Sequence, residues 1–186
     1  MAQKRAFEVN RLIPEEARKG RILDIGCGRY PFFLNSIKFE EKYGLEKNTG
    51  LLAGRSEWDP IILKAFDIHS AERVPFSDNY FNVVTMLAVF EHIWPEKLPR
   101  ILNEIWRVLR SGGYLIFTTP AAWTNKLLRF LATLNLVSPE EISDHKVLYT
   151  PSAIDDILSQ TEFKNCQKKI SYFELHMNII GFIAKV

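Results

Sequence analysis

The stretch that decides the fold is Arg21-Ile22-Leu23-Asp24-Ile25-Gly26-Cys27-Gly28. An apolar run that ends abruptly between glycines is typical of a buried strand that closes in a tight turn. Gly26 and Gly28 allow backbone conformations closed to other residues, so a ligand can approach the main chain closely. Pro31 suits the first turn of a helix, which we expect to run to about Lys38 and to aim its free N–H groups at the loop.

The rest of the chain alternates short apolar segments with amphipathic ones. Besides residues 21–25, the sequence predicts strands at 42–45, 65–68, 81–87, 114–119, 166–173 and 178–186. Between them it predicts helices at 95–110, ended by Gly112-Gly113, and at 151–160, capped by Thr150. This order indicates a doubly wound α/β domain, with a mainly parallel seven-stranded sheet and one antiparallel strand near the C-terminus. In such sheets ligands bind beyond the carboxyl ends of the strands.

Composition narrows the class of protein. The 186 residues carry 24 basic and 22 acidic side chains, a net charge of +2 that is too balanced to indicate nucleic-acid binding. The two cysteines form neither a disulfide framework nor a metal motif, and no apolar run reaches the ~18 residues of a membrane span. We therefore expect one cytoplasmic domain over residues 1–186, without a metal or a transmembrane segment.

The loop itself favours one kind of ligand. The carboxylate of Asp24 adds little to a pyrophosphate site, whereas it suits a ligand that carries an ammonium and a sulfonium. Glu46 lies 18 residues after Gly28 and could hold the ribose of a nicotinamide cofactor, but Pro31 stands where that fingerprint needs glycine. No Gly-Lys-Ser/Thr follows to make a P-loop. A tight turn without any ligand remains the alternative.

Six blocks between Arg21 and Val186 resemble one family in order and spacing: residues 22–28, 43–46, 66–68, 74–84, 90–93 and 102–113. That family is the class I S-adenosylmethionine-dependent methyltransferases, of the small kind that methylates metabolites and glycan or lipid precursors. One departure concerns residues 29–33, Arg-Tyr-Pro-Phe-Phe, where many relatives have a further glycine. The methionine end of the site is therefore expected to have a different shape.

The resemblance implies a cofactor-binding set, which is Asp24, Gly26, Cys27, Gly28, Glu46, Lys47, Asp67, Ile68, Leu87 and Ala88. The loop would line the methionine end, and Glu46 would accept hydrogen bonds from both ribose hydroxyls. Asp67 would face the adenine amino group, with Ile68 packed on the ring. The alternatives are a solvated charge for Glu46, a turn or helix cap for Asp67 and simple packing for Cys27.

Methyl transfer asks little of the protein, because a sulfonium already carries an activated methyl group. A general base is needed only if the acceptor must lose a proton. His92 follows the central strand, and His145 precedes a Tyr149-Thr150-Pro151 segment that resembles one in glycan-pathway relatives. Each is a candidate base or substrate ligand, with a structural role as the alternative.

Residues 121–148 are longer than a strand-to-helix connection requires, and residues 121–137 are strongly apolar with Lys126 and Arg129 interspersed. Residues 121–137 predict a helix packed on the core or at a dimer interface. The alternatives are a substrate lid, or a surface that makes peripheral contact with a membrane or a lipid-linked acceptor. Residues 1–19 are a candidate cover for the site. The expected activity is in-line methyl transfer to a small, lipid-linked or glycan-linked acceptor. A non-catalytic cofactor-binding or interaction protein is the alternative, and acceptor atom and oligomeric state stay open.

Overall fold

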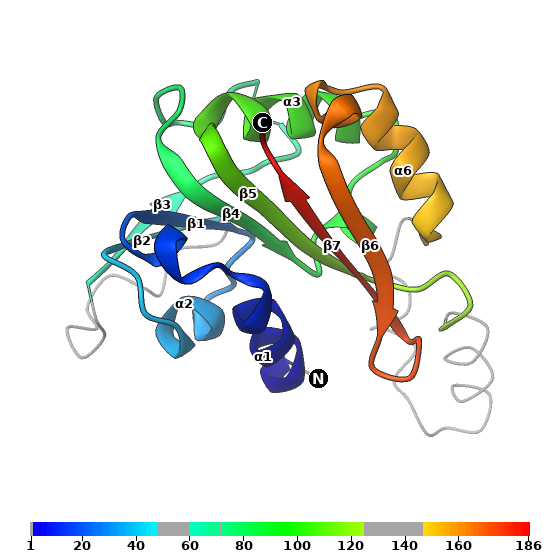
Figure 1. The fold of residues 1–186 in the computed structure, drawn as a ribbon, viewed down its shortest axis with the longest axis horizontal. Helices are drawn as coiled ribbons and strands as arrows, with labels where there is room; N and C mark the ends of the chain where they lie inside the picture. Colours follow the sequence, from blue (N-terminus) through cyan, green and yellow to red (C-terminus); the bar gives the residue numbers. More distant parts are fainter. Residues whose placement is uncertain (1, 48–59, 71, 125–146) are drawn as a thin grey trace.

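The computed structural model describes residues 2–47, 60–70, 72–124 and 147–186 (Figure 1). In chain order, the elements are α1 (Ala2–Leu12), η1 (Glu15–Arg18), β1 (Arg21–Ile25), α2 (Phe32–Ser36), β2 (Glu41–Glu46), β3 (Ile61–Ala65), β4 (Phe81–Leu87), η2 (Phe90–His92), α3 (Leu98–Val108), β5 (Leu109–Pro120), α6 (Pro151–Ser159), η3 (Glu162–Asn165), β6 (Gln167–Phe173) and β7 (Asn178–Ala184).

The strands form one seven-stranded sheet in the order β3-β2-β1-β4-β5-β7-β6. Strands β1 to β5 pair in parallel, and β7 runs antiparallel to both of its neighbours. The predicted fold class, including the single antiparallel strand, is confirmed. The chain winds from β1 outward to β3 and then returns to place β4 on the other side of β1. The topological switch point, where ligands bind in such sheets, therefore lies between β1 and β4.

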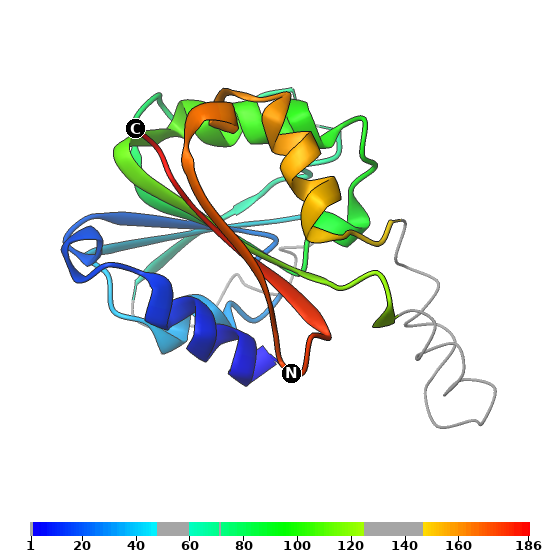
Figure 2. The ribbon, with the colours of Figure 1, turned by 45° about the vertical axis from the view of Figure 1, so that its right-hand side comes forward.

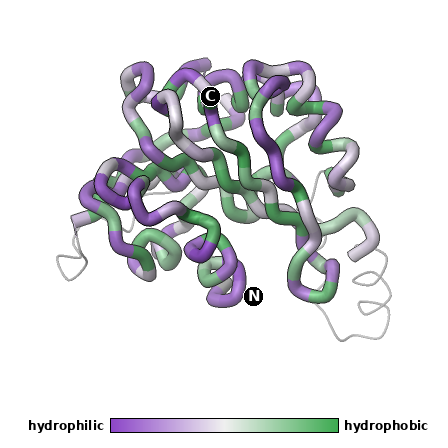
Figure 3. The backbone as a smooth tube through the Cα atoms, viewed as in Figure 1, coloured by the Kyte–Doolittle hydropathy of each residue, from purple (hydrophilic) through white to green (hydrophobic). Residues whose placement is uncertain are grey.

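Helices cover both faces of the sheet, with α1 and α2 on one side and α3 and α6 on the other (Figures 1 and 2). Successive side chains of a strand point to opposite faces, so each strand supplies both cores. Ile22 and Val83 pack in the cluster beneath α1 and α2, whereas Leu23 and Val84 pack in the cluster beneath α3 and α6. Figure 3 shows the apolar residues concentrated along these central strands. Burial on both faces explains why they read as continuous apolar runs.

The third strand lies earlier than predicted, at Ile61–Ala65 instead of residues 65–68. The N–H of Phe66 still donates to the carbonyl of Glu46, but the carboxylate of Asp67 then accepts a hydrogen bond from the N–H of His69. Such a local side-chain bond turns the backbone away from the ladder. Asp67 and Ile68 therefore follow the strand, at the edge of the sheet where ligands bind.

Helix α3 ends at Val108, so the predicted end at Gly112-Gly113 is wrong. Leu109 is extended and buried, and it already pairs with Phe81 of β4. The ammonium of Lys185 donates to the carbonyls of Trp106 and Leu109, which satisfies the end of the helix without a glycine cap. The predicted cap of α6 is confirmed, because the N–H of Ala153 donates to the Thr150 hydroxyl.

Most of the predicted apolar helix at 121–137, and all of His145, lie outside the described residues, which include only 121–124 and 147–148 of the insertion at 121–148. Val9, Ile13 and Ala17 of the N-terminal segment are buried against the core. None of residues 2–19 lines the cavity at the switch point of the sheet, so their role as a cover stays a prediction. No helix within the described ranges is long and apolar enough to cross a membrane.

Candidate functional site

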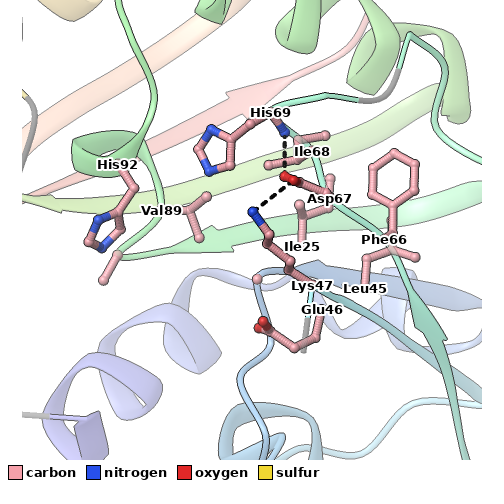
Figure 4. Close-up of a pocket in the computed structure, with 12 residues that line it drawn as sticks. Ile25, Leu45, Glu46, Lys47, Phe66, Asp67, Ile68, His69, Val89 and His92 are labelled. Atoms are coloured by element: carbon pink, nitrogen blue, oxygen red, sulfur yellow. Dashed lines mark hydrogen bonds and ion pairs between the residues drawn. The ribbon is translucent and has the colours of Figure 1, made fainter. Parts of the chain in front are cut away.

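A cavity of about 590 Å³ opens beyond the carboxyl ends of β1, β2 and β4 (Figure 4). Its volume falls in the range of small-molecule sites. The residues that line it come from five segments of the chain and are Ile25, Gly26, Leu45, Glu46, Lys47, Phe66, Asp67, Ile68, His69, Ala88, Val89 and His92. The cavity thus lies at the switch point of the sheet, where the topology places a ligand.

The glycine loop is folded onto the end of β2. The N–H groups of Gly26 and Cys27 both donate to the carbonyl of Leu45, over 2.8 and 3.2 Å. Gly26 has a φ of 74°, and a Cβ there would lie 2.6 Å from a methyl carbon of Val89. Gly28 also has a positive φ, of 73°. The loop therefore requires glycine at Gly26 for both conformation and space, and at Gly28 for conformation.

Asp24 lies at the end of β1 with only 3% of its surface exposed. The hydroxyl of Thr85 donates to its Oδ1 over 2.7 Å. Burial raises the pKa of Asp24 to about 7; the Thr85 hydrogen bond opposes the rise and the nearby charge of Glu46 adds to it. A carboxyl group in this state gains most from a ligand that brings a positive charge.

Three charged side chains gather at the ends of β2 and β3. The carboxylate of Glu46 accepts a hydrogen bond from the N–H of Gly28 over 3.0 Å, which ties it to the glycine loop. The ammonium of Lys47 forms an ion pair with Oδ2 of Asp67 over 2.9 Å, and the N–H of His69 donates to Oδ1 over 3.0 Å (Figure 4). The hydrogen bond from Lys47 is the main reason why the pKa of Asp67 is lowered.

The apolar part of the wall comes from Leu45, Phe66, Ile68 and Val89. Ala88, between β4 and Val89, has a φ of 58°, and its N–H donates to the carbonyl of Thr118 on β5 over 2.9 Å. Sequence reasoning did not select Leu45, Phe66 or Val89. Each is the immediate neighbour of a selected residue, and that adjacency was the available signal.

Two histidines line the cavity, on the side away from Phe66 (Figure 4). His92 lies on η2, whose Glu91 is buried and accepts a hydrogen bond from the Thr119 hydroxyl. His69 follows Asp67, and sequence reasoning did not select it. Among the described residues, no group of three or more histidine, cysteine, aspartate or glutamate side chains is arranged to hold a metal ion.

The predicted cofactor-binding residues divide into two groups. Those that line the cavity are Gly26, Glu46, Lys47, Asp67, Ile68 and Ala88. Among the described residues, Asp24, Cys27, Gly28 and Leu87 are not in its wall. Burial raises the pKa of the Cys27 thiol, which keeps it protonated and speaks for packing over reactivity. The cofactor-binding roles themselves stay predictions.

Comparison with known proteins shows which family this chain resembles in sequence and in fold. The family model described as a methyltransferase domain matches residues 23–117, from β1 into β5. O-methyltransferase 3 of Dictyostelium discoideum is 24% identical over 184 residues, which cover 90% of this chain and 42% of that protein. The tRNA N(3)-cytidine methyltransferase METTL2 of Danio rerio is 26% identical over 129 residues, 63% of this chain and 36% of that protein. The chain thus spans less than half the length of these curated relatives.

The fold is shared with solved structures. A SAM-dependent methyltransferase from Archaeoglobus fulgidus superposes with a TM-score of 0.68 at 16% identity, covering 100% of this chain and 95% of that one. The family match spans slightly more than half of the chain and includes the glycine loop, the β2 carboxylate and the segment after β4. The chain belongs to the methyltransferase-domain family, the class I S-adenosylmethionine-dependent methyltransferases.

Proposed function

We propose that this chain binds S-adenosylmethionine in the cavity and transfers its methyl group to a small or carrier-linked acceptor. The observation that carries the proposal is the convergence of two carboxylates, Glu46 and Asp67, on one cavity built around the glycine loop. Each comes from a different strand end. Family membership supports the same reading.

The residues present fit the adenosine part of this cofactor. Glu46 has two acceptor oxygens for the two ribose hydroxyls, and its bond to the N–H of Gly28 fixes its position. Asp67 offers a carboxylate to the amino group of the base. Phe66 and Ile68, on either side of Asp67, supply apolar surface for the faces of the ring.

The residues around the loop fit the methionine part. Gly26 exposes main chain where a Cβ would clash with Val89, so the cradle is narrow and closely shaped. Asp24 lies at the end of β1 with a raised pKa, and the ammonium of the ligand would favour its charged form. The residues that follow Gly28 depart from the family pattern, and Pro31 begins the entry into α2.

The cofactor would supply an activated methyl group, so the task of the protein is to hold the acceptor in line with the S–CH3 bond, on the side of the methyl carbon opposite the sulfur, and to limit water. Buried Glu91 holds η2 in place through the Thr119 hydroxyl, and η2 presents His92 to the cavity. In this proposal His92 binds the acceptor or takes its proton at an imidazole nitrogen, and its position in the cavity wall supports that role. The acceptor would enter from the side of His69 and His92, away from the adenine end.

Calorimetric titration with S-adenosylmethionine tests the proposal. We expect one site with a dissociation constant in the micromolar range, and a loss of affinity of about tenfold in Glu46→Gln, because the amide offers one acceptor oxygen in place of two. NAD is the matched control and should give no heat. Absence of binding at millimolar S-adenosylmethionine would contradict the proposal. Binding without formation of S-adenosylhomocysteine from any acceptor in a metabolite extract would favour the non-catalytic alternative.

A further inference from the structure

Lys47 occupies an unusual position for a cation in this cavity. It directly follows Glu46, and its side chain lies between Glu46 and Asp67, with the ammonium against the Asp67 carboxylate (Figure 4). In the proposed function these two carboxylates anchor the ribose and the base. An adenosine group that reaches both anchors must therefore pass through the space that the Lys47 side chain fills.

We propose that Lys47 is a determinant of cofactor affinity, because its ion pair with Asp67 closes the adenosine end of the cavity and must open for the cofactor to bind. This inference rests on the proposed function, since it takes Asp67 as the residue that recognises the base. It assigns to Lys47 a competing role and not the binding role expected from the resemblance.

The two partners of Asp67 differ in how easily they can leave. The N–H of His69 is a backbone group two residues away, and the turn holds it in place. The Lys47 ammonium stands at the end of a flexible side chain that is 61% exposed, so water can take over its solvation. Opening therefore means that Lys47 swings into solvent, while His69 keeps the carboxylate oriented toward the cavity.

The charges around the ion pair also make Lys47 the partner of Asp67 that can leave. Lys47 and Asp67 neutralise each other when closed, and Glu46 is held separately by the N–H of Gly28. The exposed ion pair is of the weak kind, equivalent to about a two- to fivefold change in an equilibrium constant. It is also screened by salt. The closed state should thus lower affinity by a few-fold only, and less so at high ionic strength.

Titration with S-adenosylhomocysteine separates this effect from direct repulsion of a sulfonium, because this ligand lacks that charge. We expect Lys47→Met to bind it about two- to fivefold more tightly than the wild type. Lys64→Met is the matched control. Lys64 lies on the neighbouring strand β3 with its ammonium 4.4 Å from the ring of Phe76, and it does not line the cavity. Its replacement should leave the affinity unchanged.

Two further measurements identify the mechanism. Raising NaCl from about 0.05 to 0.5 M should tighten binding by the wild type toward the value of Lys47→Met, and leave that variant nearly constant. In an Asp67→Asn background, Lys47→Met should no longer improve affinity, because the ion pair is already gone. Equal or weaker binding by Lys47→Met overturns the inference alone. Failure of the wild type to bind either ligand overturns the proposed function and the inference together.

Discussion

Two aspartates at strand ends differ in their electrostatic state, and Asp67 lines the cavity whereas Asp24 does not. Asp24, after three residues of β1, is 3% exposed and bonded to a hydroxyl, and burial raises its pKa to about 7. Asp67 lies just beyond β3, and its side chain is 24% exposed. Its carboxylate is held by the ammonium of Lys47 and the backbone N–H of His69, and both lower its pKa, the ammonium more than the N–H. Within the described part of the chain, no ion pair with Asp24 is found, whereas Asp67 is already paired with the ammonium of Lys47.

The difference between Asp24 and Asp67 shows that the residue type alone does not fix the ionisation state of a carboxyl group. Both aspartates stand in family blocks, yet Asp24 is buried near the end of β1 and the Asp67 side chain, beyond β3, is partly exposed. A ligand that brings an ammonium to Asp24 supplies the positive charge that would stabilise its ionised carboxylate. A ligand that approaches Asp67 must instead compete with Lys47. The two ends of the cavity therefore respond differently to pH, salt and substitution.

The largest effect should come from Asp24→Asn, tested as stability against pH. The folded wild type keeps a proton on Asp24 up to about pH 7, whereas the unfolded chain releases it near the ordinary value of 3.8. A raised carboxyl pKa means that stability falls as pH rises between these values, by about 4 kcal/mol in total. Asparagine still accepts the Thr85 hydrogen bond and does not ionise. Urea unfolding at pH 5 and pH 8 should show a pH-dependent loss in the wild type that the variant lacks. Parallel losses in both would contradict the account.

How tightly the β1 end is closed can be tested at the two glycines. Gly26→Ala places a Cβ at a φ of 74° and 2.6 Å from a Val89 methyl carbon, so we expect a loss of about 2–4 kcal/mol and of cofactor binding. Gly28→Ala has the same strain but no atom nearer than 3.8 Å, and should cost about 1 kcal/mol. Thermal unfolding measures both. An equal loss of stability in the two variants would show that the close contact with Val89 does not add to the cost of Gly26→Ala.

Between pH 5.5 and 7, the affinity for the cofactor should change with the ionisation of Asp24 and should not change with that of Asp67. Below pH 7 the ligand must displace a proton from Asp24, so its dissociation constant should rise by up to about tenfold per pH unit. Asp67, with its lowered pKa, stays charged over the same range. Titrations with S-adenosylmethionine between pH 5.5 and 7 should show this slope in the wild type and a flat profile in Asp24→Asn. A slope that survives in Asp24→Asn would place the responsible group elsewhere.

The smallest effect concerns Asp67→Asn. A lowered carboxyl pKa contributes stability above its ordinary value, and that contribution disappears as pH falls through the folded pKa, below about 4. Because the partner Lys47 is largely exposed, we expect a change below about 1 kcal/mol at pH 7. The difference between the unfolding free energies of the variant and the wild type should shrink steadily as pH falls below about 4. A difference that does not change with pH would show that Asp67 stabilises the fold by another route.

Much of the fold could be predicted because its signals are local. Residues 21–25 and 81–87 read as buried strands, since burial on both faces leaves continuous apolar runs. The tail from Cys166 reads as two successive strands joined by a turn. The end of α3 was placed wrongly at Gly112-Gly113. The cap comes from Lys185, which is distant in sequence, and no local pattern reveals it. The bounds of β3 failed for a related reason, because Phe66 is apolar but belongs to the turn that Asp67 makes.

At the site, the motifs predicted which residues lie near the cavity, but they did not predict the protonation of Asp24 or the ion pair of Asp67. Asp24, Glu46 and Asp67 were selected from the sequence. The structure places Asp24 and Glu46 in the last two residues of β1 and β2, and it places Asp67 beyond the end of β3 instead of inside the strand predicted at 65–68. The raised pKa of Asp24 comes from its burial in the folded sheet, and the Thr85 hydroxyl that partly opposes the rise lies 61 residues away in the chain. The ion pair of Lys47 with Asp67 depends on how β2 and β3 pair. Contacts of this kind arise from the register of the sheet, which a single sequence does not specify.

The most direct test of the central claim is a crystal structure of the protein with S-adenosylhomocysteine. We predict that the ligand fills the cavity, with both ribose hydroxyls about 2.7 Å from the Glu46 carboxylate and the amino edge of adenine facing Asp67. The methionine end should lie over the loop from Gly26 to Gly28. A ligand bound elsewhere, or a cavity that stays empty at saturating concentration, would contradict the account.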